Sequence, residues 1–237
     1  MLKLPIPCQQ HSFHHSIRLL SFPPEIDNLV RHTITTSWPQ GLQDERPYFG
    51  SNEFKLRGNP WRGSYSDAVH ARRLVCRLFE ALFSAGWVLS LSTDVSKKVQ
   101  DLDTLIFRQQ TPIPARCEWI CISFSNGDMI RFIDAPSELV TTFVGALGSL
   151  LQRHGPHKLA GAYELKLKGY PWVATGGESM KARALLLSLV STLESNGWTV
   201  YASIDQKAQQ GDNLGETDTW HCCRQVGWTS GQPVFHH

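Results

Sequence analysis

Two short segments of the chain alternate polar and apolar residues in the same way. Glu53-Phe-Lys-Leu-Arg57 and Glu164-Leu-Lys-Leu-Lys168 each place every second side chain on one face. A period of two is typical of a β-strand with one buried and one solvated face. A Gly-x-Pro-Trp sequence, which ends at Trp61 and at Trp172, follows each segment and predicts a turn.

A helical period follows each predicted strand. Two sets of leucines recur at every fourth residue: Leu74, Leu78 and Leu82, and then Leu185, Leu189 and Leu193. This spacing predicts two amphipathic helices, the first over about 67–85, with the leucines buried. Gly86 and Gly197 follow at the positions where a helix commonly ends in the left-handed conformation.

Strands are expected after both glycines. The segments 87–92 and 198–203 begin with tryptophan and are rich in β-forming residues, and 103–108 and 218–224 are the expected pairing partners. An Asn-Gly turn at 126–127 lies between two further apolar runs and predicts a hairpin over 117–134.

These segments are copies of one another. Positions 50–94 and 161–205 align without a gap and share 17 identities in 45, which indicates a tandem duplication. The predicted fold is α+β, with two α-β-α-β-β units, mainly antiparallel sheets, helices on one sheet face and approximate two-fold symmetry. The expected organisation is a flexible tail (1–22), a first repeat (23–116), a bridging hairpin (117–134), a second repeat (135–225) and a C-terminal tail (226–237).

Composition narrows the functional classes only slightly. The net charge is +2, with 23 basic and 21 acidic residues, and such a balance does not indicate a nucleic-acid or membrane partner. The sequence contains no run of 18 apolar residues, so it predicts no membrane-spanning helix. The six cysteines form no disulfide framework, since Cys222 and Cys223 are adjacent. We therefore expect a reducing compartment, the cytoplasm or also the nucleus, while residues 1–22 leave a targeting segment as an alternative.

Cations recur on the solvated face of the duplicated strand. Four basic side chains and two nearby indoles form the candidate ligand-binding set: Lys55, Arg57, Trp61, Lys166, Lys168 and Trp172. They could hold phosphates, an acidic peptide or single-stranded nucleic acid by charge and stacking. The alternative is structural, with lysines that are paired across strands or protect a sheet edge and tryptophans that close the core.

A second polar set recurs in both repeats: Arg72 and Arg183, Asp94 and Asp205, Asp103 and Asp218. By helical phase the arginines lie opposite the leucine stripe, so they are expected to face solvent or the other repeat. Pairing of Arg with Asp between helix and sheet is the favoured interpretation. A carboxylate site for acid–base chemistry or a divalent metal is the alternative.

No catalytic or metal-binding motif is present. The closest metal spacings are His221-Cys-Cys223, His154-Gly-Pro-His157 and Cys117-x3-Cys121, and none matches a tetrahedral site. We therefore expect no catalytic residues, metal or cofactor. The sequence favours a non-enzymatic binding or scaffolding protein, with a protein as partner. A nucleic-acid or phospho-ligand binder is the first alternative, and an enzyme with a site between the repeats is the second.

Overall fold

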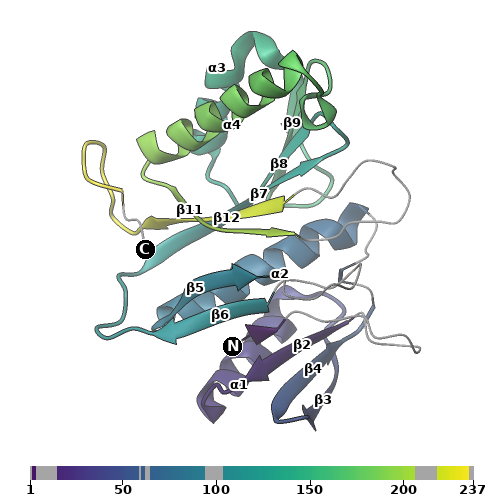
Figure 1. Ribbon diagram of the computed structural model, residues 1–237, viewed down its shortest axis with the longest axis vertical. Helices are drawn as coiled ribbons and strands as arrows, with labels where there is room; N and C mark the ends of the chain where they lie inside the picture. Colours follow the sequence, from purple (N-terminus) through teal and green to yellow (C-terminus); the bar gives the residue numbers. More distant parts are fainter. Residues whose placement is uncertain are drawn as a thin grey trace. The chain divides into compact units, whose positions relative to one another are not determined.

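The computed structural model describes residues 2–3, 15–58, 60–61, 65–93, 104–205 and 218–234. The chain forms two compact units, one mainly from Met1–Ala115 and the other from Arg116–Ser203 and Gly211–His237. Each unit combines one six-stranded sheet with two long helices (Figure 1).

The first unit contains the first six strands and two helices. They are β1 (Leu2–Lys3), β2 (Ser16–Leu20), α1 (Pro24–Ser37), β3 (Leu42–Tyr48), β4 (Ser51–Leu56), α2 (Tyr65–Ser84), β5 (Trp87–Thr93) and β6 (Thr104–Gln109). The strands lie in the order β3-β4-β2-β1-β6-β5. Their pairs are antiparallel.

The second unit repeats this series. Its elements are β7 (Cys117–Ser125), β8 (Met129–Ile133), α3 (Ser137–Leu147), β9 (Leu151–Pro156), β10 (Ala162–Leu167), α4 (Gly177–Ser195), β11 (Thr199–Asp205) and β12 (Asp218–Gln225). Short 3-10 turns at Gly148–Leu150 and Pro171–Val173 precede β9 and α4. The strand order β9-β10-β8-β7-β12-β11 matches that of the first sheet, element by element.

The common topology confirms the α+β fold and the duplication, and it lengthens the repeat. Each copy begins with two strands before its first helix and has two strands between its helices. The predicted α-β-α-β-β unit therefore lacked its first two strands and the strand that follows the first helix, β3 or β9. Residues 16–20 were expected to belong to a flexible tail but form β2, which pairs with β1 and β4. The predicted hairpin is present as β7 and β8, and these are central strands of the second sheet instead of a bridge. Their sequences differ too much between the copies for an alignment to reveal the relation.

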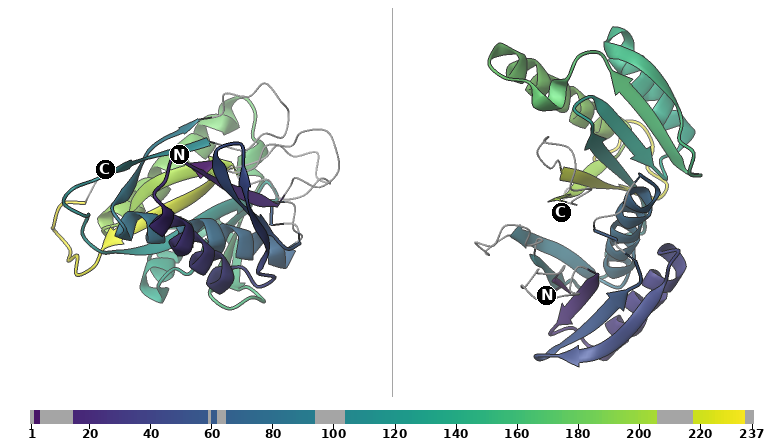
Figure 2. Two further views of the ribbon diagram at one scale, coloured as in Figure 1. Left: turned by 90° about the horizontal axis from the view of Figure 1, so that it is seen from below. Right: turned by 90° about the vertical axis from the view of Figure 1, so that its right-hand side faces the viewer.

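In the second unit both helices pack on one face of the sheet. Figure 1 shows α3 and α4 side by side, and Figure 2 shows them from two further directions in teal and green. Phe143 of α3 and Leu193 of α4 are fully buried in one cluster with alternate residues of the strands, such as Ile130 and Leu165. Burial of this apolar stripe supplies the main stabilisation of such a layer.

Both predicted helix ends are confirmed at the glycines. Gly86 and Gly197 have φ angles of +84° and +79°. After α4, the Gly197 N–H donates to the carbonyl of Glu194 and the Trp198 N–H donates to that of Leu193. These two bonds define a Schellman motif, which requires a residue that tolerates positive φ at this position.

Candidate functional site

An arginine–glutamate pair links two neighbouring strands on the helix-free face of each sheet. In the first unit Arg18 of β2 stands in register with Glu53 of β4, and its Nε donates to Oε2 of the carboxylate at 2.6 Å. In the second unit Arg131 of β8 stands in register with Glu164 of β10 and donates to Oε1 from Nε and Nη2, at 3.0 and 2.6 Å. The duplication has therefore kept an ion pair that bonds two strands on the face away from the core.

The two copies differ on the other side of the glutamate. In the first unit Arg46 of β3 stands opposite Glu53 and donates to its Oε1 from both Nε and Nη2, at 3.0 and 2.8 Å. In the second unit the residue opposite Glu164 is Gly155 of β9. A Cβ built at Gly155 would meet no atom within 4 Å. The second copy therefore has open space where the first has a guanidinium.

This space is a small cavity on the second sheet. Its volume is about 80 Å³, and its walls include Arg153, Gly155, Glu164, Lys166 and Met129. β9, β10 and β8 position these residues, because the strands lie in that order at one edge of the sheet. Gly155 is the residue that keeps the cavity open, since a longer side chain would project into it.

The glutamate of the cavity is only partly satisfied. Arg131 uses one carboxylate oxygen of Glu164, and within the described residues Oε2 accepts no hydrogen bond. The Glu164 side chain is 25% exposed, whereas that of Glu53, held by two arginines, is 1% exposed. Glu164 thus offers an acceptor that a ligand could use.

A neutral imidazole lies beside this carboxylate. His157 Nε2 is 3.9 Å from Glu164 Oε1, and its Nδ1 accepts the N–H of Leu159 at 3.1 Å. Burial lowers the pKa of His157, and the positive charge of Arg131 lowers it further. A ring nitrogen that accepts a hydrogen bond carries no proton, so the contact of Nδ1 with Leu159 favours the neutral imidazole, which adds no cation to the site.

Two cations stand opposite each other at the cavity. Arg153 of β9 is in register with Lys166 of β10. Like charges directly opposite across a strand pair are unfavourable. Lys166 is partly compensated, because its Nζ lies 3.3 Å from Oδ2 of buried Asp128. Arg153 is exposed and has no ion-pair partner in the part of the chain that the structure describes.

The predicted ligand-binding residues of the first unit differ from one another in burial and in their neighbours. Lys55 is half-buried and stands opposite Asp44 of β3, so the cation faces an acid there. Arg57 is exposed just beyond the end of β4. Trp61 is buried and cannot stack on a ligand from its present position.

The remaining members of the predicted set lie beside the cavity's strands. Lys168 is exposed and donates from Nζ to the Ser149 carbonyl at 2.7 Å. Trp172 donates from Nε1 to the Met129 carbonyl and meets Phe124 edge to face at 4.9 Å. Both contacts correspond to the structural interpretation of these residues, and of the four predicted cations Lys166 alone lines the cavity.

The described members of the second predicted set have different surroundings. Arg72 is buried and donates from Nη1 to the Ala68 carbonyl, whereas Arg183 is exposed and donates from Nη1 to Met180 Sδ. Asp218 accepts a bond from Ser203 Oγ at 2.6 Å. Two aspartates, Asp94 and Asp103, lie outside the described residues, as does the side chain of Asp205.

The described cysteines are reduced and buried. Burial raises the pKa of Cys222, and a hydrogen bond with Cys117 together with burial raises that of Cys223. Cys121 lies opposite His221 across β7 and β12. Spacing along one strand could not reveal that cross-strand neighbour, whereas the register does.

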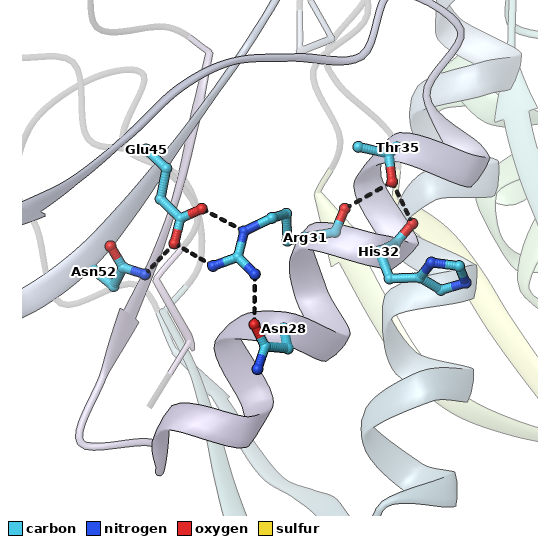
Figure 3. Close-up of polar contacts among 6 residues, drawn as sticks. All are labelled: Asn28, Arg31, His32, Thr35, Glu45 and Asn52. Atoms are coloured by element: carbon cyan, nitrogen blue, oxygen red, sulfur yellow. Dashed lines mark hydrogen bonds and ion pairs between the residues drawn. The ribbon is translucent and has the colours of Figure 1, made fainter.

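A polar cluster in the first unit attaches α1 to the sheet edge (Figure 3). Arg31 of α1 donates to both carboxylate oxygens of Glu45 on β3, at 2.6 and 2.7 Å, and Asn52 of β4 donates to Oε1 at 2.8 Å. Asn28 accepts the remaining Arg31 Nη1 donor. The bonds to Arg31 lower the pKa of Glu45. The guanidinium of Arg31 and both carboxylate oxygens of Glu45 are engaged within the cluster, so we assign it a structural role.

The strand orders and the recurring Arg–Glu pair establish two copies of one domain. A family model matches the chain at residues 8–108 and again at 118–223. The chain belongs to this domain family. The family's description states no activity. The first match begins between β1 and β2 and the second begins within β7, so both include the strand directly before the first helix of their copy. Comparisons with curated proteins and with solved structures found no match. No described helix is long and apolar enough to span a membrane.

Proposed function

We propose that this protein is a non-enzymatic binding protein that recognises an anionic group of a partner protein at the cavity of the second family domain. The observation that carries the proposal is the register pair Arg153 and Lys166 at the cavity wall. A carboxylate or phosphate between these two cations would relieve their repulsion and gain charge-assisted hydrogen bonds.

The first domain supports this proposal by contrast. There the position of Arg153 is held by Asp44, opposite Lys55, and the position of Gly155 is held by Arg46. On the equivalent face, Lys55 and Arg46 therefore each stand opposite an acid. The binding surface belongs to one repeat, and its basic strand face acts through Lys166 and Arg153 together.

The chemistry of the cavity favours binding over catalysis. None of the described residues that line it carries a hydroxyl or thiol that a base could activate as a nucleophile. The acid Glu164 is engaged by Arg131, and His157 beside it is neutral and hydrogen-bonded through Nδ1. These groups are arranged to hold charges in place.

A binding titration with two charge-reversal variants tests this function. The probes are a blocked phosphoserine peptide and a blocked aspartate peptide, both free of arginine and lysine. We expect Arg153→Glu to weaken binding at least about tenfold and wild-type affinity to fall with added salt. Arg57→Glu is the control for charge reversal, because Arg57 is an exposed cation of the first domain just beyond the end of β4.

Three results would contradict the proposal. Equal affinities of Arg153→Glu and wild type for the peptides would show that the cavity takes no part in recognition. If neither peptide binds, recognition of an anionic group is excluded. A single-stranded oligonucleotide that binds more tightly than both peptides, with loss in a variant lacking Lys55, Arg57, Lys166 and Lys168, would favour the nucleic-acid alternative.

A further inference from the structure

The cavity over Gly155 has a filled counterpart within the same chain. In the first domain Arg46 occupies this place and binds Glu53 through two nitrogens, while Arg18 binds the same carboxylate from the other strand. In the second domain Arg131 corresponds to Arg18, but no side chain corresponds to that of Arg46. The first domain therefore has a guanidinium group at the place where the second domain has open space.

We propose that the space over Gly155 binds the guanidinium group of an arginine side chain from a partner protein, with Oε2 of Glu164 as its acceptor. The inference deepens the proposed function and rests on it, because it adds a cationic group next to the anionic one on the same partner. The ligand would then be a short segment in which an arginine neighbours an aspartate, a glutamate or a phosphorylated residue.

The local charges are compatible with a cation at this point. Among the described residues Glu164 Oε2 accepts no hydrogen bond, and Nδ1 of His157 accepts the Leu159 N–H, as a neutral ring does. Lys166 faces Asp128 at 3.3 Å, which reduces its repulsion of an incoming cation. The first domain already accommodates Arg46 on the strand next to Lys55, the residue equivalent to Lys166.

Guanidinium fits better than ammonium. In the Arg46 contact two N–H groups of one plane reach the carboxylate together, a geometry that an ammonium group cannot reproduce. A neighbouring ring also lies beside the guanidinium in the first domain, where the Arg46 Cζ is 6.0 Å from the centre of Tyr48. The ring of His157 lies near Glu164 in the second domain.

Filling the cavity from within the chain tests the inference. The probe is N-acetylarginine amide, which carries no carboxylate, and the neutral citrulline analogue is its control ligand. We expect the wild type and Gly155→Ala to bind the arginine probe, and Gly155→Arg to bind it at least about tenfold more weakly, since the new side chain copies Arg46. Gly155→Arg should also raise the melting temperature.

The converse variant keeps the test decisive if Gly155→Arg does not fold. Arg46→Gly opens the same space in the first domain, and methylguanidinium at millimolar concentration should raise its melting temperature more than that of the wild type. Equal binding of the arginine and citrulline probes to the wild type would overturn the inference. So would an unchanged affinity of Gly155→Arg for the arginine probe.

The two proposals fail separately. Arg153→Glu removes the cation needed for the acidic peptides but leaves the acceptor of the guanidinium intact. Loss of acidic-peptide binding in Arg153→Glu together with no binding of the arginine probe by any variant would support the proposed function and exclude the arginine site. Binding of the arginine probe without binding of acidic peptides would show that the site takes a cation alone and overturn the combined ligand.

Discussion

Arg18 donates its Nε to the carboxylate of Glu53 at 2.6 Å across two neighbouring strands, with both side chains almost completely buried. Arg46 binds the other carboxylate oxygen of Glu53, so one acid holds two guanidinium groups. Arg18 also lies over the ring of Tyr48, with Cζ 4.1 Å from its centre. The network ties β2, β3 and β4 together on the face opposite the helices.

Removal of the central acid should destabilise the first domain strongly. Glu53→Gln would leave buried Arg18 without a negative partner, and we expect a loss of about 3 kcal/mol in the free energy of unfolding. Arg46→Ala should lose only about 1 kcal/mol, because the Arg46 side chain is 47% exposed. Urea denaturation of both variants checks the order, and a larger loss for Arg46→Ala would contradict it.

The corresponding Glu→Gln substitution should cause a smaller loss of stability in the second domain. Glu164 binds one arginine and is partly exposed, so Glu164→Gln is expected to lower the free energy of unfolding by about 1 to 2 kcal/mol. The comparison with Glu53→Gln under identical denaturant conditions measures how much the second guanidinium contributes. Equal losses at the two positions would mean that Arg46 adds nothing to the network.

The Arg31–Glu45 pair predicts a pH dependence. Its hydrogen bonds to Arg31 lower the pKa of Glu45, so the stabilisation is complete above about pH 5 and is lost as the pH falls through the lowered pKa. Burial raises the pKa of Asp27, which acts in the opposite direction. We therefore expect the difference in stability between wild type and Arg31→Ala, about 1 kcal/mol near neutral pH, to shrink in acid.

Thermal unfolding of both proteins from neutral to acidic pH, at constant ionic strength, measures this difference. Arg31→Lys is the control, because it keeps the charge but loses the paired bonds to Glu45. A difference that stays constant down to the acid limit would exclude Glu45 as its source.

Replacement of the glycine after α4 should strain the backbone. Gly197 has a φ of +79°, and a Cβ there would lie 2.3 Å from Cδ2 of Trp228. Gly197→Ala should therefore lower the free energy of unfolding by about 2 kcal/mol or more, through both backbone strain and displacement of the indole. At Gly86 the nearest atom is 3.3 Å away, so Gly86→Ala should lose less. Tryptophan fluorescence during urea denaturation follows both variants.

Local pattern was sufficient for much of the fold. Buried Leu74 and Leu189 lie on their helices as the four-residue spacing predicted. The glycine helix ends and the hairpin were also correct, because each depends on residues close together in the chain. The first strands of each repeat were missed as repeated elements, since β2 and β8 share a position in the sheet but little sequence.

The candidate site was predicted only in part. The alternation of the duplicated strand placed Glu164 and Lys166 on one face, but the glutamate was left out of the candidate set. Arg153, Gly155 and Arg131 come from other strands and carry no motif. The duplicated glutamates at positions 53 and 164 each follow an arginine earlier in their repeat. This recurrence could have suggested the Arg–Glu pair.

The sequence alone determined the duplication, many of the secondary-structure segments and the alternation of faces, because these follow from periodicities of two and 3.6 residues and from identities between copies. Tertiary structure decided which strands adjoin and in what register. That register sets Arg46 against Glu53 but Gly155 against Glu164, and so fills one site and opens the other. Such pairing depends on contacts between residues far apart in the chain, which no local pattern specifies.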